Sequence, residues 1–259
     1  MKFRTLFSGS KGNCALLEID SKKILVDCGG SMSRIVRALK ENSVSVSDID
    51  AIFITHEHHD HVSSLRMLCA NSKIKIFSHE KSACMLEGKI LAGQNLITFN
   101  SNELDFYGTQ IETYDCYHDS AHCVGYKFTS ENKSIATITD LGCVTDKLLT
   151  FVKNCELILL ESNHDEMMLK SCDYPNVVKE RILGNFGHLS NVQAGKIIVQ
   201  LPAHNVRNVW LGHISLNSNT PEVAFDSAFK CCKEARITEG KDIKINVVGQ
   251  YAQSGVFKC

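Results

Sequence analysis

The sequence feature that most constrains this chain is the segment Thr55–His61, which reads T-H-E-H-H-D-H directly after an apolar run. Crowded imidazoles repel one another when charged, and they occupy apolar space when neutral. A divalent metal removes this conflict, because neutral imidazole and carboxylate are its natural ligands. The spacing H-x-H-x-D-H predicts that His56 and His58 converge on one ion. Asp60 and His61 then point toward a second position nearby.

Two plainer interpretations of this segment are a polar loop with incidental histidines and a structural zinc site. Structural zinc usually recruits cysteine, and no cysteine lies within Thr55–His61. The twelve cysteines of the chain are scattered and form no C-x-x-C motif. The sequence therefore does not predict a cysteine-based zinc site or a thioredoxin-like centre. We expect mostly reduced, buried thiols.

The composition fits an enzyme-sized α/β domain. The chain has 259 residues, 44% of them hydrophobic, with three prolines and no linker-like tract, which predicts a single domain over 1–259. A formal net charge of -1 does not indicate a polyanionic partner, so nucleic acid would need a local basic surface. We expect no membrane partner and a cytoplasmic protein, because the sequence shows neither a signal peptide nor a long apolar run.

Strand-like and helical runs alternate along the chain. The expected strands are Phe3–Phe7, Ala15–Ile19, Lys23–Val26, Ile52–Thr55, Ile74–Phe77, Leu96–Phe99, Thr109–Asp115, Gly125–Thr129, Ser134–Thr139, Glu156–Leu160, Val206–Leu211 and Lys244–Val248. The expected helices are Met32–Glu41, Val62–Cys69, Ser78–Leu86, Thr145–Asn154, Val177–Leu183, Asn191–Leu201 and Pro221–Ala235. Two facing mixed sheets with helices outside fit this order. A doubly wound sheet fits the alternation equally well.

Three more ligand-type residues stand just after strand-like runs. They are His118, Asp140 and His213. Each repeats the pattern of the histidine segment, in which an apolar run is followed by a potential ligand. Loops at strand ends can meet at a common edge of a sheet. We therefore expect these three side chains to join the histidine segment at one centre.

With these residues in place, the chain resembles the metallo-β-lactamase superfamily, in which H-x-H-x-D-H precedes separate His, Asp and His ligands. Within it, the chain is most similar to the YycJ/WalJ group of small nuclease-like hydrolases. The segments that carry this resemblance are Ser8–Asn13, His118-Asp119, Leu160–Asp165, Gly187–Asn191 and His213–Ser215. The resemblance implies an α/β fold of four layers, an αββα sandwich of two mixed sheets with helices on the outer faces. It also implies metals at the shared edge of the sheets.

The resemblance further implies a ligand set for two divalent ions. The implied ligands are His56, His58 and His118 for one ion, Asp60, His61 and His213 for the other, and Asp140 as a bridge. An all-His/Asp set suits Zn²⁺ or Mn²⁺, and also Fe²⁺. His122 lies close to His118, and Cys123 stands where the family more often has proline. We interpret His122 as a surface histidine.

The predicted chemistry is hydrolysis. Two ions about 3.5–4 Å apart can share one water, and the bridging hydroxide that results attacks an electrophilic centre. Gly187–Asn191 resembles a segment of nucleic-acid-processing relatives whose histidine protonates a leaving alkoxide, which makes His188 the candidate general acid. A structural histidine at a helix start is the alternative. We count Asp60 and Glu161 with His188 as catalytic.

Two features allow a second interpretation. Glu161 ends a predicted strand, where it can orient His188 or a metal ligand, or act as an ordinary capping acid. The glycine-rich segment Ser8–Asn13 can present backbone N–H groups to an anion, with Lys11 adding charge, or form a plain turn. The candidate substrate contacts are Ser10, Asn13, Asn163 and Asn191.

The sequence thus predicts a dinuclear hydrolase of nucleic-acid phosphodiesters that needs no organic cofactor. Resemblance to the YycJ/WalJ group implies a 5'-to-3' exonuclease that acts on DNA rather than RNA. The chain lacks the long insertion of larger RNA-processing relatives, since only 20 residues separate Asp140 from Glu161. An open cleft favours a small or end-bound substrate. The remaining alternatives are a thioester or lactone hydrolase on the same scaffold and a metal-binding regulator without catalysis.

Overall fold

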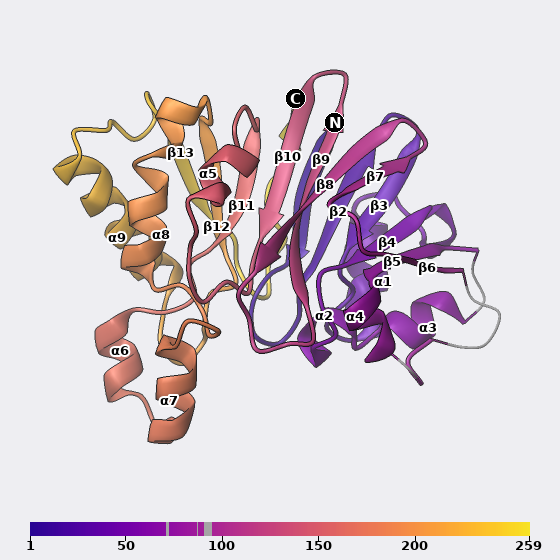
Figure 1. Cartoon of the computed structure of the whole chain (residues 1–259), viewed down its shortest axis with the longest axis horizontal. Helices are drawn as coiled ribbons and strands as arrows, with labels where there is room; N and C mark the ends of the chain where they lie inside the picture. Colours follow the sequence, from indigo (N-terminus) through magenta and orange to yellow (C-terminus); the bar gives the residue numbers. More distant parts are fainter. Residues whose placement is uncertain (71–72, 87, 91–94) are drawn as a thin grey trace.

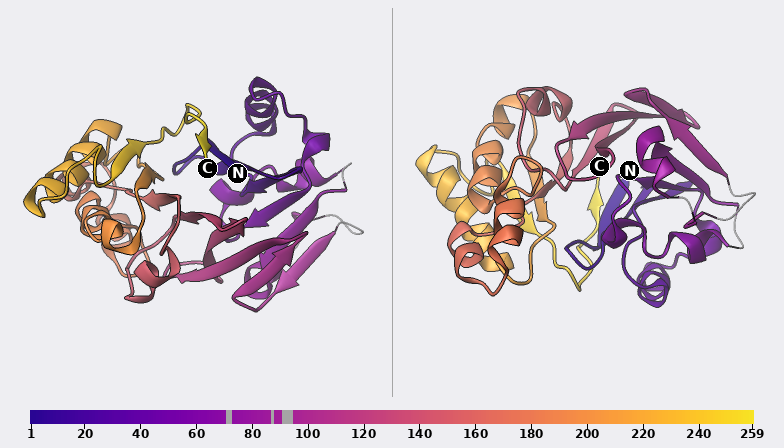
Figure 2. Two further views of the ribbon diagram at one scale, coloured as in Figure 1. Left: turned by 90° about the horizontal axis from the view of Figure 1, so that it is seen from above. Right: turned by 60° about the horizontal axis from the view of Figure 1, so that its bottom comes forward.

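The structure, a computed structural model, describes residues 1–70, 73–86, 88–90 and 95–259. The strands among these residues form two sheets that lie face to face in the middle of the molecule (Figures 1 and 2). Helices α1, α3 and α4 lie on the side of the first sheet, and α8 and α9 on the side of the second.

The first sheet contains the strand that leads to the histidine segment. Its order is β14-β1-β2-β3-β4-β5-β6. The pairs from β14 to β3 are antiparallel and those from β3 to β6 are parallel, so the sheet is mixed. Its strands are β1 (Lys2–Phe7), β2 (Cys14–Ile19), β3 (Lys22–Val26), β4 (Ala51–Ile54), β5 (Lys75–His79), β6 (Leu96–Phe99) and β14 (Phe257–Lys258).

The second sheet is also mixed, in the order β13-β12-β11-β10-β9-β8-β7. The strands from β7 to β10 pair antiparallel, and those from β10 to β13 pair parallel. They are β7 (Glu103–Phe106), β8 (Thr109–Cys116), β9 (Cys123–Ser130), β10 (Lys133–Ile138), β11 (Leu157–Glu161), β12 (Asn208–Gly212) and β13 (Lys244–Val247).

The helices connect and cover these strands. The α-helices are α1 (Met32–Glu41), α2 (His59–Val62), α3 (Leu65–Cys69), α4 (Glu80–Cys84), α5 (Lys147–Phe151), α6 (Glu166–Ser171), α7 (Asn176–Leu183), α8 (Asn191–Ile198) and α9 (Pro221–Glu234). Short 3₁₀ turns occupy Val46–Asp48 and Leu201–His204. Within the described residues, every helix is too short or too polar to span a bilayer.

Three groups of buried hydrophobic residues separate the layers. The middle group lies between the two sheets and includes Phe53 of β4 and Tyr126 of β9. A second group, with Ile35, packs the first sheet against α1. A third, with Ala194 and Ala228, packs the second sheet against α8 and α9. The layer order of helix, sheet, sheet and helix confirms the predicted αββα sandwich and excludes one doubly wound sheet.

The helix expected over Val62–Cys69 is in fact two short helices. The first, α2, begins at His59, inside the histidine segment. The chain then breaks at Ser63 and Ser64, whose hydroxyl groups both donate to the carbonyl oxygen of Gly30, at 2.8 and 2.7 Å. Serine hydroxyls that bind backbone groups compete with helical hydrogen bonding. These two hydrogen bonds tie the end of the histidine segment to the loop after β3.

We expect Phe53→Ala to destabilise the fold by about 3–5 kcal/mol, because the side chain is fully buried and truncation leaves a cavity. The Phe53 ring stacks on Phe77, with centroids 4.4 Å apart, and meets the edges of Phe106, Tyr126 and Phe128. Urea unfolding measures the change in the free energy of unfolding. Met167→Ala is the control, because that side chain is exposed and its loss should cost less than about 0.5 kcal/mol. Equal effects of the two substitutions would contradict the expectation.

Candidate metal centre

The candidate ligands lie where loops leave the two sheets at a common edge. In the first sheet, β4 is followed by Thr55–His61. In the second sheet, β10 is followed by Asp140 and β12 by His213. β8 runs in the same direction as β10, since both pair antiparallel with β9, and it is followed by His118. This is the edge toward which the β10 arrow points in Figure 1.

Ligand-type atoms at this edge form four overlapping groups, and within each group they lie no more than 4.8 Å apart. The groups are His56, His58 and His118; His56, His61 and Asp140; Asp60, His61 and His213; and Asp140, Glu161, His188 and His213. Four residues each belong to two groups and so connect all four groups, namely His56, His61, Asp140 and His213. The structure therefore brings the seven predicted ligands together with His188 and Glu161, and their binding of metal stays a prediction.

The donor set fits a divalent metal. His56 is fully buried, and its Nε2 atom has no hydrogen-bond partner among the described residues. Burial, reinforced by the nearby charge of His61, lowers the pKa of His56 well below its ordinary value. The neutral imidazole that results is the form that binds metal. A buried polar atom without a hydrogen-bond partner is energetically costly. A cation bound to the lone pair of Nε2 would remove this cost.

Asp140 lies at the middle of the arrangement. Its Oδ2 atom is 3.1 Å from Nε2 of His61 and 3.0 Å from Nδ1 of His213. Its Oδ1 atom is 3.7 Å from Nε2 of His118. Burial raises the pKa of Asp140, but the charges of His213 and His61 outweigh burial and hold the pKa well below its usual range. An ionised carboxylate between two sets of imidazoles suits a bridging role.

Asp140 and His213 both adopt left-handed backbone conformations, with φ values of 59° and 53°. Residues other than glycine rarely enter this region, which costs of order 1–3 kcal/mol and is concentrated at functional sites. In this chain the conformation turns each residue out of the end of its strand. The strain is held by neighbouring contacts, such as the hydrogen bond of 2.9 Å from His213 N to Ser8 Oγ.

Asp27 is a site residue that the sequence analysis missed. Its Oδ1 atom accepts from the backbone N–H of Thr55 at 2.8 Å, and its Oδ2 atom lies 2.7 Å from Nδ1 of His61. Because a carboxylate only accepts, Nδ1 of His61 carries the proton in this pair, and Nε2 is the atom that a neutral His61 would offer to a metal. The sequence did carry a signal for Asp27, because this residue follows an apolar strand as the predicted ligands do.

We expect Asp27→Asn to weaken metal binding by about 10- to 100-fold, because the amide no longer fixes His61 as a carboxylate does. Competition with a chromogenic chelator measures the affinity. Asp50→Asn is the matched control, since Asp50 stands just before β4, at the other end of the strand from His56. That variant should bind metal as the parent does. An unchanged affinity in Asp27→Asn would remove Asp27 from the centre.

His188 is held by a buried carboxylate. Nδ1 of His188 lies 2.8 Å from Oε1 of Glu161, which is fully buried at the end of β11. Oε2 of Glu161 accepts from the backbone N–H groups of Leu141 and Leu189, at 2.9 and 3.1 Å. Burial raises the pKa of Glu161, but the charge and hydrogen bond of His188 outweigh it and lower the pKa. Glu161 therefore contacts His188, as the first of its two interpretations requires, and its role in orienting His188 stays a prediction.

The segment Ser8–Asn13 wraps around the other side of the centre. Nδ2 of Asn13 lies 3.0 Å from Nε2 of His61 and 3.3 Å from Oδ2 of Asp60, while its Oδ1 accepts from the backbone N–H of Gly9. Ser10 is exposed. This geometry places Asn13 against the predicted ligands, while Ser10 is accessible to solvent. A role of either residue in binding substrate stays a prediction.

The other two asparagines that we predicted as substrate contacts are buried in loop contacts. Asn163 donates to the carbonyl oxygen of His213 at 3.0 Å. Asn191 accepts from Ser162 Oγ at 2.7 Å and exchanges hydrogen bonds with the side chain of Asn219. These contacts brace the loops after β11 and β12 against α8, and this geometry favours a bracing role over contact with substrate.

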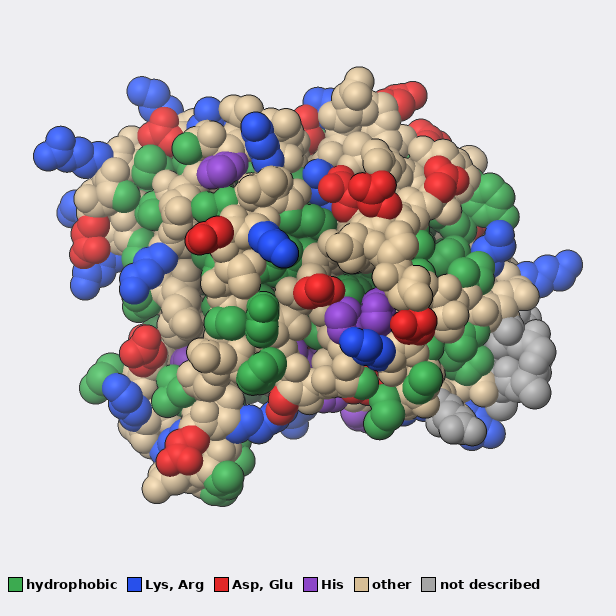
Figure 3. All heavy atoms as spheres, in the orientation of Figure 1, with side chains coloured by type: hydrophobic (Ala, Val, Ile, Leu, Met, Phe, Trp, Pro, Cys, Tyr) green, Lys and Arg blue, Asp and Glu red, His purple; other side chains and the backbone are tan. Residues whose placement is uncertain are grey.

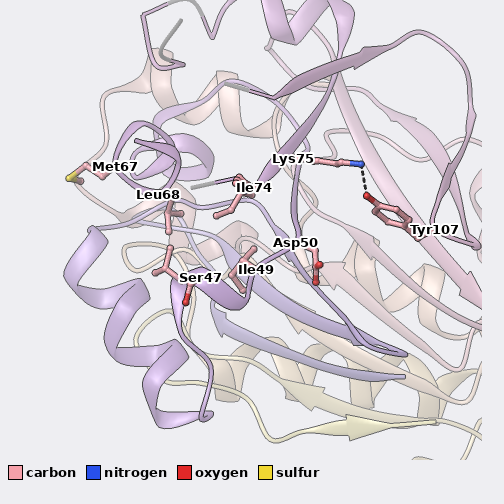
Figure 4. Close-up of a pocket in the computed structure, with 10 residues that line it drawn as sticks. Ser47, Ile49, Asp50, Met67, Leu68, Ile74, Lys75 and Tyr107 are labelled. Carbon is pink, nitrogen blue, oxygen red and sulfur yellow. Dashed lines mark hydrogen bonds between the residues drawn. The ribbon is translucent and has the colours of Figure 1, made fainter. Parts of the chain in front are cut away.

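Two further features lie apart from the four ligand groups. His122 stacks on His79, with ring centroids 3.8 Å apart, and its Nε2 atom lies 3.1 Å from Asp115. A cavity of about 530 Å³ is lined by residues including Asp50, Lys75 and Tyr107 (Figure 4). Asp50 precedes β4, whereas the histidine segment follows β4. The cavity therefore lies at the end of β4 that is away from the candidate metal centre.

Comparisons with known proteins agree with this geometry. The family model described as the metallo-beta-lactamase superfamily matches residues 8–145. The chain is 33% identical over 249 residues to the exodeoxyribonuclease WalJ of Streptococcus pneumoniae, covering 94% of this chain and 93% of WalJ. It is 31% identical over 249 residues to the exodeoxyribonuclease YycJ of Bacillus anthracis, covering 95% of this chain and 94% of YycJ.

A solved structure with the same fold is the metallo-β-lactamase fold protein YhfI of Bacillus subtilis, with a TM-score of 0.72, 16% identity, and coverage of 99% of this chain and 98% of YhfI. At that identity, YhfI supports the fold alone. The family model and the two exodeoxyribonucleases match the amino-acid sequence of this chain, so they support membership of a family as well as a fold. The chain therefore belongs to the metallo-β-lactamase superfamily, as a hydrolase close to the WalJ and YycJ exodeoxyribonucleases.

Proposed function

We propose that this protein is a dinuclear metal-dependent phosphodiesterase that acts on nucleic acid, as a 5'-to-3' exonuclease on DNA in the cytoplasm. The observation that carries the proposal is the His188–Glu161 pair beside Asp140, with Nδ1 of His188 3.8 Å from Oδ1 of Asp140. A phosphodiester differs from a thioester in its need for a proton on the leaving oxygen. A histidine held next to the predicted ligands supplies that proton.

Each side chain has a distinct task in this proposal. The seven predicted ligands would hold two divalent ions, Zn²⁺ or Mn²⁺ or Fe²⁺, which polarise the phosphate and activate a water when bound. Glu161 keeps His188 oriented through Nδ1, so that the proton to be donated lies on Nε2. Among the carboxylates of the four ligand groups, that of Asp60 is the most exposed, which allows it to take a proton from the attacking water.

The names of the relatives support DNA as the substrate, since both WalJ and YycJ are called exodeoxyribonucleases. The short connections around the centre support binding of a strand end. The helices α6 and α7 project from the second sheet as a pair below the rest of the molecule in Figure 1 and do not extend across to the first sheet.

A substrate panel tests this function. The protein is loaded separately with Zn²⁺, Mn²⁺ and Fe²⁺ and assayed on end-labelled DNA and RNA, bis-p-nitrophenyl phosphate, lactoylglutathione and a lactone. We expect DNA with a 5' label to release labelled mononucleotide from the first turnovers, and DNA with a 3' label to shorten gradually. Turnover confined to the thioester or lactone would favour the rival hydrolase. Inactivity with every metal and substrate would favour a regulator.

A further inference from the structure

Two aromatic side chains stand exposed at the rim of the candidate metal centre. Tyr117 is 43% exposed and Phe186 is 57% exposed. Their ring centroids are 6.0 Å apart and the ring planes are inclined by 50°. Tyr117 directly precedes the predicted ligand His118, and Phe186 lies two positions before His188. The two rings therefore belong to the loops that supply a metal ligand and the general acid.

Backbone contacts hold these two loops against each other. The carbonyl oxygen of Phe186 accepts from the N–H of Asp119 at 3.0 Å, and that of Tyr117 accepts from the N–H of Gly142 at 2.8 Å. A Cβ atom on Gly142 would lie 2.4 Å from the carbonyl oxygen of Asn185, so the loops touch through their backbones. The backbone segments that carry the two rings are thus held at a fixed place beside the centre.

A second set of contacts joins the loops that carry Tyr117 and Phe186 to α7. Arg181 forms a two-point ion pair with Asp119, and one of its two hydrogen bonds measures 3.0 Å. The carbonyl oxygen of Gly187 lies 3.1 Å from Nδ1 of His118. A Cβ atom on Gly187 would lie 2.2 Å from the carbonyl oxygen of Ile182, so only glycine allows this approach. Movement of Phe186 away from the centre would break these contacts.

The charge of the protein makes aromatic contacts important for a nucleic-acid ligand. The chain has 28 basic and 29 acidic residues. The face drawn in Figure 3 carries blue and red side chains interspersed, without a broad basic surface. On that face, the affinity that arises from neutralised phosphates is then small. Stacking of bases on aromatic side chains contributes about 1–3 kcal/mol per base and does not depend on sequence.

We propose that Tyr117 and Phe186 form a stacking site for the terminal nucleobase of the strand whose phosphate is held at the metal centre. The inference rests on the proposed nuclease function and adds to it how an end is recognised. A base is joined to its phosphate through one sugar, so a phosphate at the centre places its base at the rim. A strand end presents an unstacked base face, whereas the interior of a duplex does not.

The test compares two DNA oligonucleotides that are identical except that one lacks its terminal base. The parent protein should lose about 10-fold or more in kcat/KM on the abasic substrate, mainly through KM, as expected for one stacked base. The double variant Tyr117→Ala and Phe186→Ala should lose a similar factor on normal DNA. It should show almost no further loss on the abasic substrate, because the interaction is already absent.

Further variants make the outcome specific. Tyr117→Phe and Phe186→Trp keep an aromatic face and should retain the preference of the parent for a terminal base. Phe229→Ala removes an exposed phenylalanine of α9, which lies in the outer helical layer, and should act as the parent does. Metal content equal to that of the parent shows that the centre is intact in each variant.

The inference is overturned if the double variant still discriminates fully against the abasic end. Loss of a parent dimer in the double variant, measured by sedimentation, would assign the pair to an interface between two copies and would also overturn it. Failure of the parent to cleave DNA is a separate result, because it removes the proposed function before any variant is compared.

Discussion

Asp140→Ala should leave the protein folded but unable to retain its metal ions, with turnover on DNA reduced by about 10³-fold or more. The reason is the position of Asp140 between the ligand groups, where it lies within 3.1 Å of both His61 and His213. No other carboxylate among the described residues belongs to both groups that contain Asp140. Removing it leaves two buried imidazoles without the charge that they share.

The charge of Asp140 also sets the protonation of its neighbours. Burial lowers the pKa of His213, but Asp140 and other acids outweigh burial and raise it to about 9. Without Asp140 this pKa should fall, so the loss of metal is not caused by stronger competition from protons. Metal analysis after dialysis measures occupancy, and circular dichroism checks the fold. Asp173→Ala, in the exposed connection between α6 and α7, should keep both ions. Full occupancy in Asp140→Ala would refute the bridging role.

His188→Ala should retain its metal ions, unlike Asp140→Ala, but should lose about 10²- to 10⁴-fold in turnover on DNA. Its side chain is 14% exposed, and its hydrogen bond to the described residues is the one from Nδ1 to Glu161. Alanine therefore removes the proton donor with little effect on the fold. His188→Gln keeps a side chain able to bond to Glu161 but has no transferable proton, and it should be equally impaired.

The leaving group separates proton donation from a structural role. A nitrophenolate departs without a proton, whereas a sugar alkoxide needs one. His188→Ala should therefore lose much less activity on bis-p-nitrophenyl phosphate than on DNA. An equal loss on the two substrates would indicate that His188 shapes the centre instead. Unchanged turnover on DNA would remove His188 from the mechanism.

The candidate ligands were predictable because each follows an apolar run that ends at the same edge. His56, Asp140 and His213 all have this local pattern, and the strand order then brings them together. Asp27 has the same pattern but was missed, because its role depends on the parallel pairing of β3 with β4. That pairing places Asp27 beside Thr55, and no local sequence signal reveals which strands are neighbours.

Short elements were less predictable than the overall architecture. β7 has only four residues, and it exists because it pairs with β8, Glu103 lying opposite Glu112. α6 is capped by Asp165, whose carboxylate accepts from the N–H groups of Met167 and Met168. An isolated helix of this length is marginal in water, so its capping and packing decide whether it forms. The hydrogen bonds of Asn191 likewise depend on Asn219, which lies far away in the sequence.

The most direct test of the account is stepwise return of metal to the chelator-treated protein, with release of mononucleotides from 5'-labelled DNA as the readout. A dinuclear centre should give no release without metal, a rate that rises as Zn²⁺ or Mn²⁺ is added, and saturation near two equivalents per chain. A rate that does not depend on added metal, or one that saturates at a single equivalent, would contradict a centre built from two ions.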